Sequence, residues 1–169
     1  MIYEIKQDGK FKYIEEGNGE PLLLLHGLFG ALSNFAHLIE YFNKSYKVVV
    51  PMLPLLDLDL LHTSVGGLQK FVHKFIENRN YTSINLLGNS LGGHVALVHI
   101  LKHPERIKSL TLTGSSGLFE SGMGDTYPKR GDKEYIRNKT ALTFYDPAIA
   151  TDELVNEVFE ITNNRLKVI

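Results

Sequence analysis

The sequence predicts an α/β fold in which a mostly parallel sheet is flanked by helices. Two apolar runs, at residues 22–25 and 46–50, are typical of strands buried on both faces. Apolar residues recur at helical spacing over 35–42 and 66–78. A glycine-rich turn within the segment INLLGNSLGGH (84–94) then joins a third apolar run directly to another helix. This alternation of strands and helices is the pattern of a parallel sheet.

The chain opens with a predicted antiparallel hairpin. Residues 2–7 and 10–15 have strand character, and Asp8-Gly9 between them is a strong two-residue turn signal. We therefore expect the sheet to begin with two antiparallel strands before the parallel strands start.

Three helices are expected to flank the sheet. Ser33 or Asn34 can cap the first, because a short polar side chain accepts hydrogen bonds from the N–H groups of a first helical turn. The second covers 66–78, where the apolar residues form one stripe. The third runs from residue 91 to about 102 and is apolar on nearly every face, as expected for a helix buried against a sheet. His103-Pro104 ends it, since proline disfavours helical backbone in the preceding residue.

A change of composition follows the next predicted strand, at 110–113. A polar, loop-like segment leads into two predicted helices, around 135–144 and 151–163. We therefore divide the chain into residues 1–117, the first part of an α/β core, and 118–169, a helical region.

Ser90 lies between Gly88 and Gly92, with Gly93 next, where the third apolar run meets its helix. The spacing G-x-S-x-G at a strand-to-helix turn is that of a nucleophile elbow. Glycine relieves the clash that side chains would make at such a tight turn. The helix N-terminus favours negative charge that develops nearby. The pattern can also arise by chance in a glycine-rich loop, but the strand before it and the helix after it are those that the motif requires.

The segment HGLFG that follows the strand at 22–25 has the character of an oxyanion loop. The backbone N–H groups of Leu91 and Leu28 are the expected oxyanion hole, with Phe29 as the neighbouring loop residue. His26 and Gly27 are expected to support this loop. We interpret His26 as a structural histidine that bonds loop backbone, because a residue before the oxyanion loop points away from the place of a base.

Three segments, LLLLHGLFG, GNSLGGHVAL and HPERIKSLTLTG, together resemble the α/β-hydrolase superfamily in sequence and in order. Asn89 and the doubled glycine resemble the branch that contains carboxylesterases and the carbon–carbon hydrolases of meta-cleavage products. The stretch 141–165 is similar to the helical cap, or lid, of those enzymes. The resemblance implies an α/β-hydrolase fold with an N-terminal hairpin and a helical cap.

This resemblance also implies a function. It implies a serine hydrolase that cleaves a carboxylic ester or a related acyl bond through an acyl-enzyme, acting on a small-molecule acyl substrate with no cofactor and no metal. Carbon–carbon hydrolysis of ring-cleavage dienoates is the alternative, and Asn89 is a candidate substrate contact. Relatives that open epoxides or carbon–halogen bonds use aspartate as the nucleophile, so Ser90 argues against both reactions.

The acid and the histidine that this superfamily places after later strands are not found. All seven histidines lie at or before residue 103: His26, His37, His62, His73, His94, His99 and His103. His94 projects to the side of its helix, His62 is an outside candidate in a loop, and the other helical histidines are expected on surface or boundary faces. The carboxylates after residue 117 are expected to begin helices or to be solvated.

Two explanations of this gap stay open. The chain is either a fragment that lacks the last strands of the fold, or a protein that keeps a ligand cleft without catalysis. We favour the first, because a sheet ending at 110–113 would expose an apolar edge, which also predicts self-association.

Composition narrows the class of protein further. A net charge of −1 argues against nucleic acid or an anionic membrane as a partner. The absence of cysteine excludes disulfides, thiolate zinc sites and a cysteine nucleophile. The first residues show no leader pattern, and no apolar run approaches the roughly 20 residues of a membrane span, so we expect a cytoplasmic protein.

Overall fold

The computed structural model describes residues 3–27, 35–55, 64–118 and 131–163. Contacts along the chain divide it into two compact units, Met1–Phe119 and Glu120–Ile169. The boundary expected from composition lies two residues earlier, between 117 and 118. Each unit is described by itself below.

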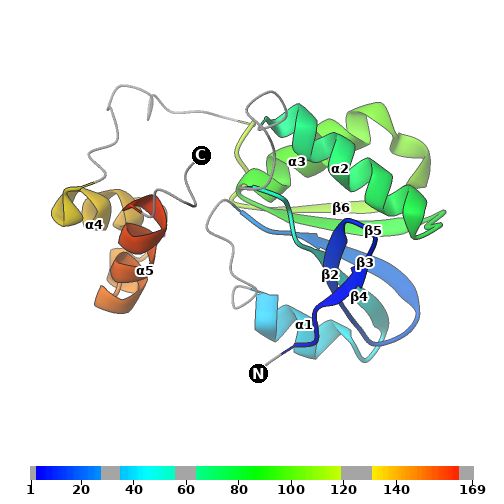
Figure 1. Ribbon diagram of the computed structural model, residues 1–169, viewed down its shortest axis with the longest axis horizontal. Helices are drawn as coiled ribbons and strands as arrows, with labels where there is room; N and C mark the ends of the chain where they lie inside the picture. Colours follow the sequence, from blue (N-terminus) through cyan, green and yellow to red (C-terminus); the bar gives the residue numbers. More distant parts are fainter. Residues whose placement is uncertain (1–2, 28–34, 56–63, 119–130, 164–169) are drawn as a thin grey trace. The chain divides into compact units, whose positions relative to one another are not determined.

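The first unit contains a six-stranded sheet in the order β1-β2-β4-β3-β5-β6 (Figure 1). Strands β3, β4, β5 and β6 pair in parallel, whereas β1 pairs with β2, and β2 with β4, in antiparallel fashion. The mostly parallel sheet expected from the sequence is therefore confirmed. The strands are β1 Lys6–Asp8, β2 Phe11–Glu16, β3 Glu20–Leu25, β4 Tyr46–Pro51, β5 Ile84–Asn89 and β6 Ile107–Thr113.

The N-terminal hairpin is present, but its turn lies one residue later than predicted. Asp8 pairs with Phe11, so the two loop residues are Gly9 and Lys10 and not Asp8 and Gly9. Gly9 has φ +56°, a conformation that glycine adopts without steric cost. Glycine at the first loop position suits the two-residue turns that require positive φ there.

Helices cover both faces of the sheet (Figure 1). Helices α2 (Val65–Asn78) and α3 (Leu91–Lys102) pack on one face and α1 (Ala36–Phe42) on the other. Helix α3 has the predicted bounds. Helix α2 begins one residue earlier than predicted, because Ser64 caps it by accepting a hydrogen bond from the Gly67 N–H (3.1 Å).

Helix α1 begins at Ala36, after Phe35, whose side chain makes no capping hydrogen bond. Ser33 and Asn34, the predicted capping residues, lie outside the described residues.

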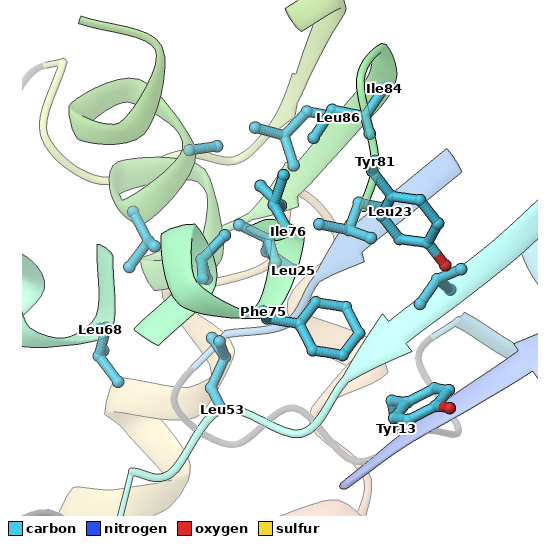
Figure 2. Close-up of a cluster of buried hydrophobic side chains, with 14 of the residues drawn as sticks. Tyr13, Leu23, Leu25, Leu53, Leu68, Phe75, Ile76, Tyr81, Ile84 and Leu86 are labelled. Atoms are coloured by element: carbon cyan, nitrogen blue, oxygen red, sulfur yellow. The ribbon is translucent and has the colours of Figure 1, made fainter. Parts of the chain in front are cut away.

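Alternate residues of β3 belong to two different hydrophobic clusters. Leu23 and Leu25 pack with α2 and α3, whereas Leu22 and Leu24 pack with α1. Figure 2 shows Ile76 of α2 beside Leu25. Successive strand side chains point to opposite faces, so a strand covered on both faces needs an unbroken apolar run. The predicted double-sided burial is confirmed.

Strand β6 forms one edge of the sheet. Its apolar side chains, Ile107, Leu110 and Leu112, are half-buried against the core of the α2–α3 face. Its exposed side chains are polar: Lys108, Ser109, Thr111 and Thr113. The expected apolar edge is thus wrong in part, since alternation turns the apolar side chains toward the helices. Self-association through this edge stays a prediction.

The second unit is a pair of helices, α4 (Lys133–Ala141) and α5 (Asp152–Asn163), connected by a short 3₁₀ turn, η4 (Pro147–Ile149). Ile136, Ala150, Val155 and Val158 form its core. Asp132 accepts a hydrogen bond from the Tyr135 N–H (3.0 Å), and Asp146 accepts one from the Ala148 N–H (2.9 Å). The helix-start roles expected for these two carboxylates are confirmed. Across the described parts of both units, no helix has the length and apolar character needed to cross a membrane.

Candidate active site

Ser90 occupies the turn between β5 and α3, and it is exposed. Its backbone has φ 52° and ψ −118°, a left-handed conformation that strongly favours glycine. A non-glycine residue in such a conformation costs about 1–3 kcal/mol, and it persists only where its surroundings hold it. The structure thus places a strained, exposed serine at the N-terminus of α3, a helix that is buried on the side facing the sheet and α2 but exposes Leu101.

The glycines around Ser90 allow the backbone segments of the turn to touch. A Cβ atom at Gly92 would lie 2.1 Å from the carbonyl oxygen of Leu25, at the end of β3. A Cβ atom at Gly88 would lie 2.6 Å from the carbonyl oxygen of Gly92, and one at Gly93 would lie 2.5 Å from Ser115 Oγ. Real Cβ atoms do not approach other atoms so closely, so a side chain at any of these three positions requires movement of the turn or its neighbours.

The chain just after β3 lies directly against the serine. A Cβ atom at Gly27 would lie 3.1 Å from Ser90 Cβ. Leu91 is the first residue of α3, where N–H groups lack partners within the helix and the helix dipole is positive. Leu28 and Phe29, the rest of the predicted oxyanion loop, lie outside the described residues.

The backbone of Ser90 is hydrogen-bonded on both sides. Its N–H donates to the carbonyl oxygen of Thr113 (3.1 Å), at the end of β6. Its carbonyl oxygen accepts from the N–H groups of Gly93 (3.0 Å), His94 (3.2 Å) and Ser116 (3.3 Å). Strand β6 and the residues that follow it therefore hold the turn from outside the helix.

Asn89, the predicted substrate contact, is half-buried and bonds to the protein. Its Nδ2 donates to the carbonyl oxygen (3.0 Å) and to Oγ1 (3.1 Å) of Thr113. Both N–H bonds of this amide are thereby occupied. A substrate contact by Asn89 stays a prediction.

His26 is buried and bridges two segments. The N–H of Leu53, just after β4, donates to His26 Nε2 (3.0 Å), so the ring proton lies on Nδ1, which donates to the carbonyl oxygen of Gly27 (2.8 Å). Burial lowers the pKa of His26 and keeps the ring neutral. These bonds fix the backbone at the ends of β3 and β4.

His99 is buried, with 1% of its surface exposed, and the expectation of a surface or boundary position is wrong. It lies on the side of α3 that packs against α2, where Gln69 Nε2 donates to His99 Nδ1 (3.3 Å). Burial, with the charges of His103 and His73, lowers the pKa of His99 to about 4. The ring lies about 13 Å along the helix from Ser90, at about 1.5 Å per residue, too far to act as its base.

Among the residues that the structure describes, the remaining histidines do not complete a triad with Ser90. His37 is exposed on α1, and the ring of His94 is half-buried against Gly117. His62 lies outside the described residues. Within the described ranges, no hydrogen bond joins the Ser90 hydroxyl to a histidine, and no group of three or more His, Asp or Glu side chains is arranged to hold a metal.

Comparison with known protein sequences identifies relatives. The chain matches the family model of the alpha/beta hydrolase fold over residues 20–144. Lipase 1 of Psychrobacter immobilis is 31% identical over 140 residues, which cover 79% of this chain and 43% of the lipase. The 2-hydroxy-6-oxo-6-(2'-aminophenyl)hexa-2,4-dienoic acid hydrolase of Metapseudomonas resinovorans is 31% identical over 117 residues, which cover 63% of this chain and 39% of that enzyme.

Solved structures give the same result. MGS-MChE2, an alpha/beta hydrolase enzyme from a sediment metagenome of the lagoon of Mar Chica, Morocco, is 39% identical, with a TM-score of 0.73 over 97% of this chain and 60% of its own. The meta-cleavage product hydrolase CumD of Pseudomonas fluorescens IP01 is 22% identical, with a TM-score of 0.70 over 90% of this chain and 60% of its own, and shows likeness of fold. The chain thus spans less than half the length of the curated relatives named above. The family match and the shared fold together show that this chain belongs to the alpha/beta hydrolase family.

Proposed function

We propose that this chain carries the nucleophile of a serine hydrolase that cleaves a carboxylic ester or a related acyl bond. The observation that supports this most directly is Ser90 itself, exposed at φ 52° between β5 and the N-terminus of α3. A protein that only needed a turn here would place glycine at the strained position. A serine in that conformation keeps a hydroxyl at the cost of backbone strain, which is the arrangement of a nucleophile elbow.

In the proposed reaction Ser90 Oγ adds to the substrate carbonyl carbon while its proton passes to a base. The carbonyl oxygen becomes anionic and accepts hydrogen bonds from the Leu91 N–H and, as the sequence predicts, from the Leu28 N–H. The ester C–O bond then breaks and the alkoxide leaves with the proton. Water hydrolyses the acyl-enzyme in a second step of the same kind.

The names of several relatives support this class of substrate. A lipase of Psychrobacter immobilis and a monoacylglycerol lipase of Xenopus laevis, which is 30% identical over 125 residues, are both named for ester cleavage. The dienoic acid hydrolase of Metapseudomonas resinovorans favours a second candidate, carbon–carbon hydrolysis of a ring-fission dienoate. Parallel assays with short nitrophenyl esters and with a ring-fission dienoate separate the two reactions.

A candidate of another class is a ligand-binding protein without catalysis. It is favoured by the lack of a histidine bonded to Ser90 among the described residues. A fluorophosphonate probe, which forms a covalent bond with an activated serine, decides between an enzyme and a binding protein.

The test applies this probe to the 169-residue chain and to the longest open reading frame that encodes it, with Ser90→Ala as the control. We expect phosphonylation at Ser90, located by peptide mass mapping, and none in the Ser90→Ala variant. Labelling of the longer protein alone would support the proposal, with a base supplied from outside residues 1–169. Failure to label Ser90 in both folded proteins would refute the proposal and favour the binding protein.

A second measurement does not depend on a base. In Ser90→Cys the thiol would lie at the N-terminus of α3, where the helix dipole stabilises a thiolate. We expect iodoacetamide to alkylate this thiol faster, at pH 7, than the thiol of Ser83→Cys, an exposed position in the turn before β5. Equal rates would show that the turn does not stabilise an anion.

A further inference from the structure

Asn89 connects the turn of Ser90 to the end of β6. Asn89 and Thr113 are direct partners in the pairing of β5 with β6, and each is the last residue of its strand. The Asn89 side chain donates to both oxygen atoms of Thr113, the backbone carbonyl at 3.0 Å and Oγ1 at 3.1 Å. The same carbonyl oxygen accepts the N–H of Ser90 at 3.1 Å. One acceptor is thus shared by the strained residue and by the side chain before it.

The chain after Thr113 returns to the other side of Ser90. Gly114 has φ +52° and lies at a bend of the backbone. Ser116 then donates its N–H to the carbonyl oxygen of Ser90 (3.3 Å). The segment 113–116 therefore contacts both peptide groups of Ser90, and Asn89 is the side chain that fixes the first residue of that segment.

The strain at Ser90 gives these bonds a specific role. A residue at φ 52° relaxes toward negative φ unless its two peptide groups are held. Such a rotation would redirect both Ser90 Oγ and the adjacent Leu91 N–H. The first group is the proposed nucleophile and the second is a proposed oxyanion donor, so their mutual placement depends on the same restraint.

We propose that Asn89, acting through Thr113, is a positioning residue that holds Ser90 in its reactive conformation, and is not a contact for the substrate. This inference rests on the proposed function of Ser90. It assigns Asn89 a role that the G-x-S-x-G spacing leaves open, because the spacing requires glycines but no particular residue before the serine.

The same strand pair supplies a matched control. Asn85 and Ser109 are also register partners of β5 and β6, and Ser109 Oγ donates to Asn85 Oδ1 (2.7 Å). This bond joins the same two strands through the same type of residue, at the end away from Ser90. Asn85→Ala removes this cross-strand bond, together with a long one from Asn85 Nδ2 to Glu20 Oε2 of β3 (3.5 Å), without a change at the turn.

The first test is hydrogen exchange followed by NMR, which needs no activity. In Asn89→Ala and Asn89→Asp, which both lack the amide donor, we expect the amide protons of Ser90 and Ser116 to exchange roughly 10-fold faster than in the original chain. The amide exchange rate of Leu86, in the buried centre of β5, should not change in these variants. Asn85→Ala should leave the exchange rates of Ser90 and Ser116 unchanged. Equal exchange rates of Ser90 and Ser116 in Asn89→Ala and Asn85→Ala would overturn the proposal.

The second test measures kcat and KM for a short nitrophenyl ester in the protein form that the probe labels. A positioning residue lowers kcat, by roughly 10- to 100-fold, and leaves KM unchanged, since the ground-state contacts persist. Thr113→Val keeps the carbonyl acceptor and loses Oγ1. Its kcat should lie between that of Asn89→Ala and that of the original chain. A raised KM with unchanged kcat in Asn89→Ala would instead make Asn89 a substrate contact and overturn the inference.

The two tests separate this inference from the proposed function. If no protein form is labelled or hydrolyses esters, the proposed function fails, and the exchange comparison alone decides whether Asn89 holds the turn. If Ser90 is labelled, but Asn89→Ala and Asn85→Ala have the same amide exchange rates and the same kcat, the proposed function stands and the positioning role of Asn89 fails.

Discussion

His99, buried between α2 and α3, is predicted to account for a measurable part of the loss of stability of this protein in acid. Burial first, then the charges of His103 and His73, lowers the pKa of His99 from 6.5 to about 4. Some groups have a lower pKa in the folded state than in the unfolded state. Such a group contributes its full stabilisation when the pH is above its pKa in the unfolded state. The contribution of His99 is therefore complete above pH 6.5 and is lost as the pH falls toward 4.

The size of the effect follows from the two pKa values. At about 1.36 kcal/mol per pKa unit, the linkage relation gives a loss of about 2–3 kcal/mol in the free energy of unfolding at pH 4.5 relative to pH 7.5. Solvent screens the charges of His73 and His103, which are partly exposed, and this reduces the loss to about 2 kcal/mol. Glu105 raises the pKa of His99 and Arg106 lowers it, while Lys102 Nζ donates to Oε1 of Gln69 (3.4 Å) beside the ring.

The assay is urea unfolding followed by tyrosine fluorescence and circular dichroism at four pH values from 7.5 to 4.5. His99→Leu removes the titrating imidazole and fills its place with an apolar side chain of similar volume. His37→Gln removes an exposed histidine of α1 and serves as the control. We expect the original chain to lose about 2 kcal/mol more than His99→Leu across this range, and His37→Gln to follow the original chain.

The contributions of other titrating groups to the pH dependence of stability cancel when the original chain is compared with His99→Leu. Burial lowers the pKa of His26, which adds to acid loss equally in the original chain and in His99→Leu. Burial raises the pKa of Glu15, but the charges of Arg79 and Lys6 lower it on balance, so this group also acts in both proteins. Parallel pH dependence in the original chain and in His99→Leu would refute the account of His99 as a buried neutral histidine.

Three further substitutions test the described contacts by chemical denaturation. Gly92→Ala should lower the free energy of unfolding by about 3 kcal/mol or prevent folding, because the new methyl group would lie 2.1 Å from a carbonyl oxygen of β3. Gly131→Ala, which places its methyl group in open space, should lower it by less than about 1 kcal/mol. Glu15→Gln should cost about 1–2 kcal/mol, since Glu15 accepts a charged hydrogen bond from Arg79 (2.9 Å); no loss would mean that solvent replaces this bond. Val155 is fully buried in the second unit, so Val155→Ala should lower the free energy of unfolding of that unit by about 2 kcal/mol. We expect to observe this as a weaker helical circular dichroism signal in mild urea. An unchanged signal would show that α4 and α5 do not depend on this core.

The central strands and the turn at Ser90 could be predicted because their sequence patterns admit few alternatives. An unbroken run such as Leu22–Leu25 fits a strand with helices on both faces, and its alternate residues do pack into two clusters. Gly88 near the end of β5 and Gly92 and Gly93 in the first turn of α3 imply close contacts, and the structure shows which atoms make them.

The errors arise where a residue's environment is set by distant parts of the chain. The burial of His99 depends on Gln69, which lies on another helix, and helical periodicity does not show that a polar residue on a packed face has such a partner. The position of the hairpin turn depends on which residue adopts positive φ, and Gly9 is compatible with either register. The hydrogen bonds from Asn89 to Thr113 follow from the pairing of β5 with β6, which the sequence of β5 does not specify.

The close contacts of Gly88, Gly92 and Gly93 also bear on how this protein can diversify. A methyl group at any of these three positions would lie within 2.6 Å of another atom, so a substitution there requires the turn or its neighbours to move. A substitution that leaves the backbone of this turn in place therefore has to fall at one of its other positions. The junction of β3, β5 and α3 is in this sense sterically fixed, because its backbone segments touch where side chains would otherwise lie.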